Sequence, residues 1–210
     1  MARSHLYRGW GTGVYARLSA AVVGPLHERL VARLARELPP GATVLDIGSG
    51  PGGFLIALRD ARADLRLIGI DPAAAAVRHA RRAAGGRPIA WVRAVAEALP
   101  VADAGIDQVV ATGSVKYWGD RCRAFAELRR VLAPGGSALL HELDPLGGDR
   151  LGAVVTEYPR ITATVLRRFV LPGSPPRAEI RAAAVAATLE VVADGPSDGL
   201  PFSAIELRRG

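Results

Sequence analysis

The chain has 210 residues, half of them hydrophobic, and a formal net charge of +7 at pH 7. This length suits one domain with a substantial core, and Cys122, the single cysteine, excludes an internal disulfide and a cysteine-based metal cluster. The sequence shows no apolar run that could span a bilayer and no signal-peptide stretch, so we expect a cytoplasmic protein without a membrane span and without a metal.

The positive charge raises the question of nucleic-acid binding. Lys116 is the only lysine among the 27 basic residues, and the arginines are scattered through a chain rich in Ala and Gly. No run of about five or six basic residues occurs, as would be typical of a nucleic-acid-binding tail. We interpret the arginines as the codon bias of a GC-rich genome, which disfavours nucleic acid as a partner.

Residues 1–38 are predicted to form a lead-in followed by one helix. Residues 1–18 mix aromatic and glycine residues, which indicates a flexible lead-in. Apolar residues recur at helical spacing over residues 19–38, Ser19 is placed to cap the helix, and Pro-Pro-Gly at residues 39–41 ends it.

Strands and helices are then predicted to alternate. The predicted strands cover residues 43–47, 65–70, 88–95, 106–111 and 137–143. The predicted helices run from the turn after the first strand to about residue 59, over residues 73–84, and over residues 119–132. This alternation implies right-handed crossovers and a mainly parallel sheet.

The last third of the chain has a different pattern. Residues 149–171 are predicted to be a helical insertion, and Ser174-Pro175-Pro176 is predicted to begin a further helix as a cap followed by a first-turn proline. Two strand-like runs, residues 189–193 and 201–207, suit an antiparallel pair. We therefore expect a single α/β domain over residues 1–210, with seven strands and helices on both faces of the sheet.

A glycine-rich turn follows the first strand. Residues 44–53 read V-L-D-I-G-S-G-P-G-G, so Gly48, Gly50 and Gly53 satisfy the G-x-G-x-x-G pattern of dinucleotide sites. Asp71 ends the second strand, where a carboxylate suits the ribose hydroxyls of either a nicotinamide cofactor or S-adenosylmethionine. The glycines alone do not separate the two ligands.

Asp46 favours the second ligand. It lies two residues before the first glycine, where a pyrophosphate would face an uncompensated negative charge that costs several kcal/mol by a Coulomb estimate. S-adenosylmethionine carries no phosphate, and its sulfonium and ammonium groups would be attracted to a carboxylate. The alternative is that Asp46 caps the following helix or binds the amides of the turn.

Five segments together resemble the class I S-adenosylmethionine-dependent methyltransferases. They occur in the family's order and spacing, at residues 44–52, 69–72, 96–100, 106–110 and 125–136. The resemblance is closest to the small-molecule group that includes the ubiquinone- and menaquinone-biosynthesis methyltransferases. It implies a Rossmann-like, mostly parallel seven-stranded sheet that ends in an antiparallel pair.

The resemblance also implies a set of cofactor-binding residues. They are Asp46, Gly48, Ser49, Gly50, Asp71, Pro72, Ala96, Glu97, Thr112 and Gly113. The residues of the glycine turn would line the methionine part, Asp71 would take the ribose hydroxyls, and Thr112 would flank the reactive methyl group. Val95 departs from the family, which often has an aspartate at this position, so the adenine amino group would rely on backbone contacts.

Methyl transfer from a sulfonium is an in-line displacement that can proceed by alignment alone, and it needs a base only if the acceptor loses a proton early. His141, near the end of the fifth strand, is the candidate base because histidine titrates near neutrality, and Tyr117 is a second candidate catalytic residue. A structural, hydrogen-bonded His141 is the alternative. The other histidines, among them His27 and His79, are interpreted as surface residues.

The acceptor is predicted to be a small, partly apolar organic molecule. Aromatic side chains are candidate substrate contacts, with ordinary hydrophobic packing as the alternative: Tyr7, Trp10, Tyr15, Trp118 and Tyr158. The insertion at residues 149–171 would cover the acceptor pocket. An RNA methyltransferase and an S-adenosylmethionine-binding protein without methyl transfer stay open as alternatives, and we expect a monomer or homodimer.

Overall fold

The computed structural model describes residues 12–143, 173–197, 200 and 202–210, with side chains from residue 23 onward. The predicted insertion at residues 149–171 and the candidate substrate residues Tyr7, Trp10 and Tyr158 lie outside the described residues, as does the side chain of Tyr15.

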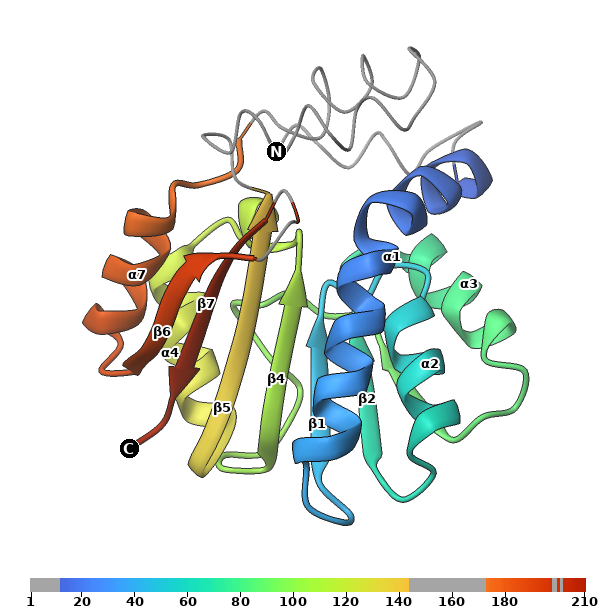
Figure 1. The fold of residues 1–210 in the computed structure, drawn as a ribbon, viewed down its shortest axis with the longest axis horizontal. Coiled ribbons are helices and arrows are strands. Elements are labelled where there is room, and N and C mark those ends of the chain that lie inside the picture. Colours follow the sequence, from blue (N-terminus) through green and yellow to red (C-terminus); the bar gives the residue numbers. More distant parts are fainter. Residues whose placement is uncertain (1–11, 144–172, 198–199, 201) are drawn as a thin grey trace.

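Seven strands form one sheet in the order β3-β2-β1-β4-β5-β7-β6 (Figure 1). The strands are β1 (Thr43–Ile47), β2 (Arg66–Ile70), β3 (Ile89–Val92), β4 (Ile106–Thr112), β5 (Leu132–Leu143), β6 (Glu190–Pro196) and β7 (Phe202–Arg208). The pairs among β1 to β5 are parallel, whereas β7 is antiparallel to both β5 and β6. The prediction of a mostly parallel sheet with a terminal antiparallel pair is confirmed.

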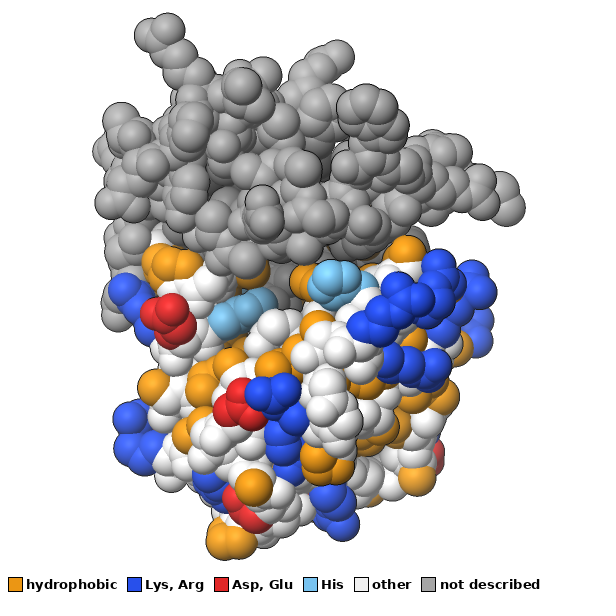
Figure 2. Space-filling model, turned by 90° about the vertical axis from the view of Figure 1, so that its right-hand side faces the viewer, with side chains coloured by type: hydrophobic (Ala, Val, Ile, Leu, Met, Phe, Trp, Pro, Cys, Tyr) orange, Lys and Arg blue, Asp and Glu red, His pale blue; other side chains and the backbone are white. Residues whose placement is uncertain are grey.

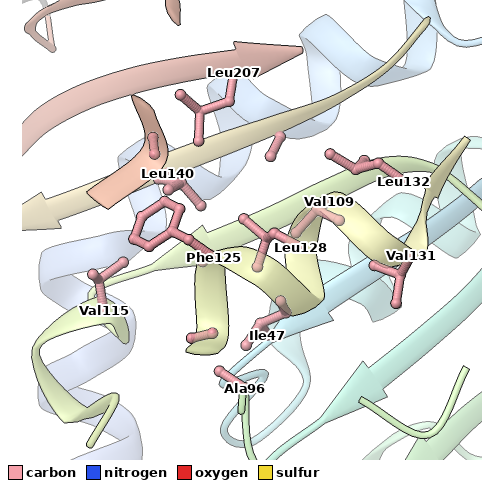
Figure 3. Packing of buried hydrophobic residues seen from close by; sticks show 14 of the residues in the cluster. Ile47, Ala96, Val109, Val115, Phe125, Leu128, Val131, Leu132, Leu140 and Leu207 are labelled. Carbon is pink, nitrogen blue, oxygen red and sulfur yellow. The ribbon is translucent and has the colours of Figure 1, made fainter. Parts of the chain in front are cut away.

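Helices cover both faces of this sheet. They are α1 (Thr12–Glu37), α2 (Gly53–Ala61), α3 (Ala74–Ala83), the short 3-10 helix η2 (Val115–Tyr117), α4 (Arg121–Val131) and α7 (Arg177–Ala186). One hydrophobic cluster packs α1, α2 and α3 against the sheet, and the other packs α4 and α7 against the opposite face (Figures 1 and 3).

Alternate residues of the central strands enter opposite clusters, as the pleat of a strand requires. Val109 packs under α4, and Val110 packs under α1 and α2. In the same way Leu45 and Ile47 face α4, whereas Val44 faces α1. Asp46, two residues after Val44, therefore projects toward the α1 face.

Helix α1 begins seven residues earlier than predicted. The sequence indicated a lead-in up to residue 18, but α1 starts at Thr12 and continues through Pro25. Glycine disfavours a helix by only about 1 kcal/mol, so Gly13 does not prevent one when the helix packs along a whole domain. The predicted cap at Ser19 is wrong, because that residue lies inside the helix.

Two further boundaries differ from the prediction. Strand β5 begins at Leu132, since Leu132 already pairs with Ile106 before the glycine turn that was expected to precede the strand. The last helix has Pro176 as its N-cap residue without a side-chain cap. Ser174 does not cap it, because its hydroxyl donates to Glu142 Oε1 at 3.4 Å instead.

The described residues contain neither a membrane-spanning helix nor a metal-binding cluster. None of the described helices is both long and apolar enough to cross a membrane. In the same part of the chain, no three His, Cys, Asp or Glu side chains are grouped so that they could hold a metal ion.

Candidate functional site

The glycine turn is held directly beside the end of β2. The backbone N–H groups of Gly48 and Ser49 both donate to the carbonyl of Ile70 at 2.9 Å. Gly48 has φ +81°, and a Cβ at this position would lie 2.4 Å from the Cβ of Ser114. Glycine is thus required here both by the left-handed backbone and by the close approach of the segment after β4.

Asp71 fastens the turn to the end of β2. Its Oδ2 accepts from the N–H of Gly50 at 3.0 Å, and its Oδ1 accepts from the N–H of Ala73 at 2.8 Å. Burial raises the pKa of Asp71, and these two hydrogen bonds oppose that rise. Each carboxylate oxygen has a further lone pair, so the group can still accept hydrogen bonds from a ligand.

Asp46 lies at the mouth of the turn with a buried oxygen that no partner satisfies. The residue is 2 % exposed, and its Oδ1 has no hydrogen-bond partner among the described residues. Burial, with a smaller contribution from the charge of Asp71, raises the pKa of Asp46 to about 8. Such a site is short of positive charge or hydrogen-bond donors, and both are what a cationic ligand brings.

The capping interpretation of Asp46 finds no support in these contacts. The N-cap residue of α2 is Gly52, which receives no side-chain cap, and the first two amides of the turn bind Ile70. The hydroxyl of Ser49 is a second buried polar atom of this turn without a described partner. Two buried polar groups at the turn thus have no partner among the described residues, and they fit a ligand such as S-adenosylmethionine.

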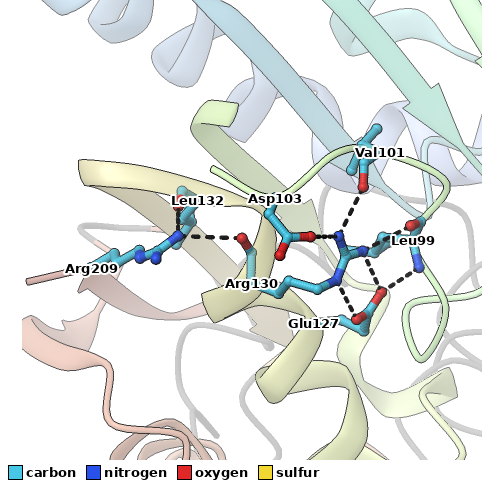
Figure 4. A network of polar contacts seen from close by, with 7 residues as sticks. All are labelled: Leu99, Val101, Asp103, Glu127, Arg130, Leu132 and Arg209. Carbon is cyan, nitrogen blue, oxygen red and sulfur yellow. Dashed lines mark hydrogen bonds and ion pairs between the residues drawn. The ribbon is translucent and has the colours of Figure 1, made fainter. Parts of the chain in front are cut away.

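The predicted adenine-side loop is braced by α4. Glu97 accepts from the N–H of Asp120 at 3.1 Å, so its side chain is used to anchor the loop. The guanidinium of Arg130 binds the carbonyls of Leu99 and Val101 at 3.0 and 2.9 Å, and it also pairs with Glu127 (Figure 4). This network fixes the loop, while Ala96 is buried beneath it.

The carboxyl ends of β4 and β5 bring two histidines to one place. The N–H of Gly113 donates to the carbonyl of His141 at 2.7 Å, and Thr112 is the register partner of His141. The hydroxyl of Thr112 lies 3.0 Å from Nε2 of His27, which comes from α1. The interpretation of His27 as a surface residue is therefore wrong.

A signal for His27 was present in the sequence. His27 follows Val23 by four residues and precedes Leu30 by three, which places it on the stripe of α1 that packs against α2. Its ring centroid lies 5.4 Å from that of Phe54, in the first turn of α2. A polar residue on an apolar stripe of a helix is the pattern that indicates that His27 faces the interior.

Burial keeps both imidazoles neutral. It lowers the pKa of His27 and of His141 to about 4, and for His141 the charges of Arg33 and His27 add to the effect. The prediction that His141 is a base rested on titration near neutrality, and that reason is not supported. His141 nevertheless lies at the expected edge of the sheet, with its Nδ1 3.1 Å from the hydroxyl of Ser197.

The two aromatic residues after β4 have different surroundings. Tyr117 is 46 % exposed, with the Lys116 ammonium 5.3 Å from its ring centre. Trp118 is 6 % exposed and packs edge-on against Phe125, with 5.7 Å between ring centroids. Trp118 thus belongs to the core under α4. This matches the alternative of ordinary hydrophobic packing and not a substrate contact.

A buried ion pair supports this corner of the site. Lys116 Nζ lies 3.4 Å from Glu142 Oε1, and both side chains are almost fully buried. Glu142 also accepts from the backbone N–H groups of Lys116 and Leu143 at 3.1 and 2.9 Å. Burial lowers the pKa of Lys116, and the charge of Glu142 opposes that change. The pair joins η2 to the end of β5.

Residues 45–140 match a protein family described as a methyltransferase domain. The matched segment runs from β1 into β5. An uncharacterized methyltransferase of Mycobacterium sp. strain JLS is 36 % identical over 151 residues, which are 70 % of this chain and 55 % of that protein. The chain spans about half the length of the curated relatives it matches.

Solved structures share the fold of this chain. An S-adenosylmethionine-dependent methyltransferase from Aquifex aeolicus has a TM-score of 0.74 at 15 % identity, covering 96 % of this chain and 100 % of that one. A methyltransferase from Thermotoga maritima, titled a possible histamine N-methyltransferase, has a TM-score of 0.68 at 19 % identity and covers 98 % of each chain. Both of these structures are described as S-adenosylmethionine-dependent methyltransferases.

Proposed function

We propose that this protein transfers a methyl group from S-adenosylmethionine to a small, partly apolar organic acceptor. The observation that carries the proposal is the buried Oδ1 of Asp46 beside the glycine turn, which has no partner in the part of the chain that the structure describes. Nicotinamide dinucleotides would bring phosphate to this carboxylate, whereas S-adenosylmethionine brings a sulfonium and an ammonium group.

Different residues of the chain would bind the methionine, ribose and adenine parts of the cofactor. Asp46 and the glycine turn, with the Ser49 hydroxyl, would face the methionine part, and Asp71 would bind the ribose hydroxyls. Pro72 and the backbone of Ala96 and Glu97 would border the adenine. Arg130 and Glu127 hold that loop in place, so the adenine edge is preorganised before the cofactor arrives.

Bound S-adenosylmethionine supplies an electrophilic methyl carbon on a sulfur that leaves as a neutral thioether. The protein's part is alignment and exclusion of water, which in favourable cases lowers the barrier by about 7–11 kcal/mol. Thr112 and Gly113 end β4 next to the glycine turn, because Ser114 closes against Gly48. The acceptor would therefore approach over the ends of β4 and β5, where Tyr117 is exposed.

Two features of this edge support a small and partly apolar acceptor. The imidazoles of His27 and His141 are neutral, and the exposed ring of Tyr117 adds apolar surface. A catalytic role for Tyr117, with its hydroxyl near the acceptor, belongs to the same proposal.

Methyl transfer to RNA is a second candidate, which exposed arginines on α3 favour. They are Arg78, Arg81 and Arg82. On the face drawn in Figure 2, basic side chains form one group and otherwise lie singly among apolar and acidic ones. Elsewhere arginines are already paired with carboxylates, among them Arg33, Arg62, Arg87, Arg121, Arg130 and Arg181. This pairing reduces the positive charge that is free to bind phosphates.

Calorimetry with S-adenosylmethionine, S-adenosylhomocysteine and NADH tests the cofactor assignment. We expect both sulfur compounds to bind and NADH not to bind. Tight binding of NADH, or binding of S-adenosylmethionine that is unchanged in Asp46→Asn and Asp71→Ala, would contradict the proposal. Tight binding of tRNA or rRNA, with no transfer to small molecules, would favour the second candidate.

A further inference from the structure

We propose that His27 and His141 together form the acceptor subsite and that they bind the hydroxyl group of an alcohol or phenol. This inference rests on the proposed function and narrows it to O-methylation. It also gives a role to a residue of α1 that lies outside the segment matched by the methyltransferase family.

The pleat of the sheet places the side chains on one face. Val110 of β4 and Leu139 of β5 belong to the cluster under α1 and α2. Thr112 and His141 follow them by two residues, so both project to the same face as Asp46. Thr112 and His141 are also direct neighbours in the parallel pairing of β4 with β5.

Helix α1 brings the second imidazole to these two residues. His27 Nε2 is 3.0 Å from Thr112 Oγ1, and its ring stacks at a tilt on Phe54, immediately after the glycine turn. Thr112 is the register partner of His141, so the ring that is bound to Thr112 lies beside the end of β5. His27 therefore lies where the glycine turn and the ends of β4 and β5 meet.

Each ring has one nitrogen held and one available. Thr112 Oγ1 holds Nε2 of His27, and Ser197 Oγ holds Nδ1 of His141. No residue in the described part of the chain binds Nδ1 of His27 or Nε2 of His141. A neutral imidazole with one nitrogen held can offer the other as a donor or as an acceptor, depending on its tautomer.

The charge of the subsite selects the ligand. Burial lowers the pKa of both rings to about 4, so near neutral pH they offer no positive charge to a carboxylate or phosphate. Arg33, whose charge acts on His141, is bound by Glu37 and Glu206. A neutral hydroxyl, which both donates and accepts, matches two neutral imidazoles.

The weak basicity of these rings distinguishes oxygen from nitrogen. As the acceptor oxygen bonds to the methyl carbon, the carbon–sulfur bond breaks, its electron pair stays on sulfur, and the hydroxyl proton moves to the available imidazole nitrogen. The imidazolium then releases this proton to water. A protonated ether is a far stronger acid than such an imidazolium, whereas a methylated alkylammonium is a far weaker one. The rings can thus deprotonate the product of an alcohol or phenol and not the product of an alkylamine.

The test is a titration of protein saturated with S-adenosylhomocysteine and carrying ¹⁵N-labelled histidine rings. The hydroxyl probes are phenol and 1-hexanol, and the amine probes are aniline and hexylamine. We expect a hydroxyl probe to shift the ring signals of His27 and His141 and to leave those of His79 unchanged, since His79 is exposed on α3. Shifts with the amines alone, or no shift of either ring with any hydroxyl probe, would overturn the proposal.

Variants separate this inference from the function on which it rests. His27→Gln keeps a donor and acceptor near Thr112, and His79→Gln is the matched control. We expect His27→Gln to lower methyl transfer to the responding hydroxyl probe at least tenfold while its affinity for S-adenosylmethionine stays within about twofold. Unchanged transfer contradicts the subsite. Absence of S-adenosylmethionine binding in the wild type contradicts the proposed function instead.

Discussion

The two halves of the site differ in how they treat charge. At the glycine turn the buried side chains are carboxylates, Asp46 and Asp71, and one of them has an oxygen with no described partner. At the ends of β4 and β5, on the same face of the sheet, the corresponding side chains are the imidazoles of His27 and His141, which burial keeps neutral. The edge of this face can therefore attract a cation at the glycine turn, while the neighbouring imidazoles suit a neutral acceptor.

The largest expected effect is the loss of stability when Trp118, in the core beneath the acceptor half, is replaced. Trp118→Ala removes a buried ring from the cluster under α4 and should lower the free energy of unfolding by about 3–5 kcal/mol. Tyr117→Ala, its exposed neighbour, should change stability by less than about 1 kcal/mol. Urea unfolding of both variants measures this, and equal losses would mean that Trp118 is not a core residue.

Asp46→Asn tests the charge of the cofactor half. Loss of the carboxylate should weaken binding of S-adenosylmethionine about 100-fold, which equals about 2.7 kcal/mol, because the sulfonium and ammonium groups lose their counter-charge. Asp103→Asn is the control, since Asp103 is an exposed partner of Arg130. If Asp46→Asn binds S-adenosylmethionine as tightly as the control does, the carboxylate of Asp46 is not what attracts the cofactor.

The pH dependence of stability should have opposite signs in the two halves. Because burial raises the pKa of Asp46 from 3.8 to about 8, the folded protein keeps a proton that the unfolded chain loses above about pH 4. The contribution of Asp46 to stability therefore falls as pH rises toward 8, whereas the amide of the Asp46→Asn variant does not titrate and adds no such slope. We expect cofactor-free Asp46→Asn to gain about 2–3 kcal/mol over the wild type between pH 5 and pH 7.

The histidines give the reverse slope. Burial lowers the pKa of His141 from 6.5 to about 4, so its contribution to stability is present above pH 6.5 and is lost as pH falls toward 4. Unfolding curves of the wild type, Asp46→Asn and His141→Asn at several pH values separate the two contributions. Parallel curves for all three proteins would contradict this account.

Gly48→Ala should have a smaller effect on cofactor binding, and it tests the shape of the turn. The new Cβ would meet Ser114 in a backbone with φ +81°, so we expect about a tenfold loss of affinity for S-adenosylmethionine. Gly86→Ala is the control, because Gly86 has φ +84° but no atom within 4 Å of a new Cβ. It should show the backbone strain as lower stability, without loss of affinity.

Local sequence predicted the sheet, and it predicted that Asp46, the glycine turn and Asp71 lie at neighbouring strand ends. The apolar runs bounded by glycine and proline define the strands. One strand–turn–helix unit contains Asp46 and Gly48, and the strand that follows it ends next to Asp71. Their contacts are short-range consequences of that unit, such as the bond from Gly50 to Asp71. Local sequence patterns are therefore enough to predict where these residues lie.

The acceptor half was predicted less well because it depends on long-range packing. His27 meets Thr112 across 85 residues of sequence, and only the docking of α1 on the sheet brings them together. Ser174 binds Glu142 rather than capping a helix, and Trp118 turns into the core. No local pattern distinguishes an aromatic residue that lines a pocket from one that packs beneath it.

The number of protons released when S-adenosylmethionine binds at pH 7 tests the central claim most directly. Titration calorimetry in buffers of different ionisation enthalpy measures it. If Asp46 is protonated in the free protein and ionised against the cationic cofactor, close to one proton should leave per molecule bound, and Asp46→Asn should release none. Binding without proton release in the wild type would contradict the account.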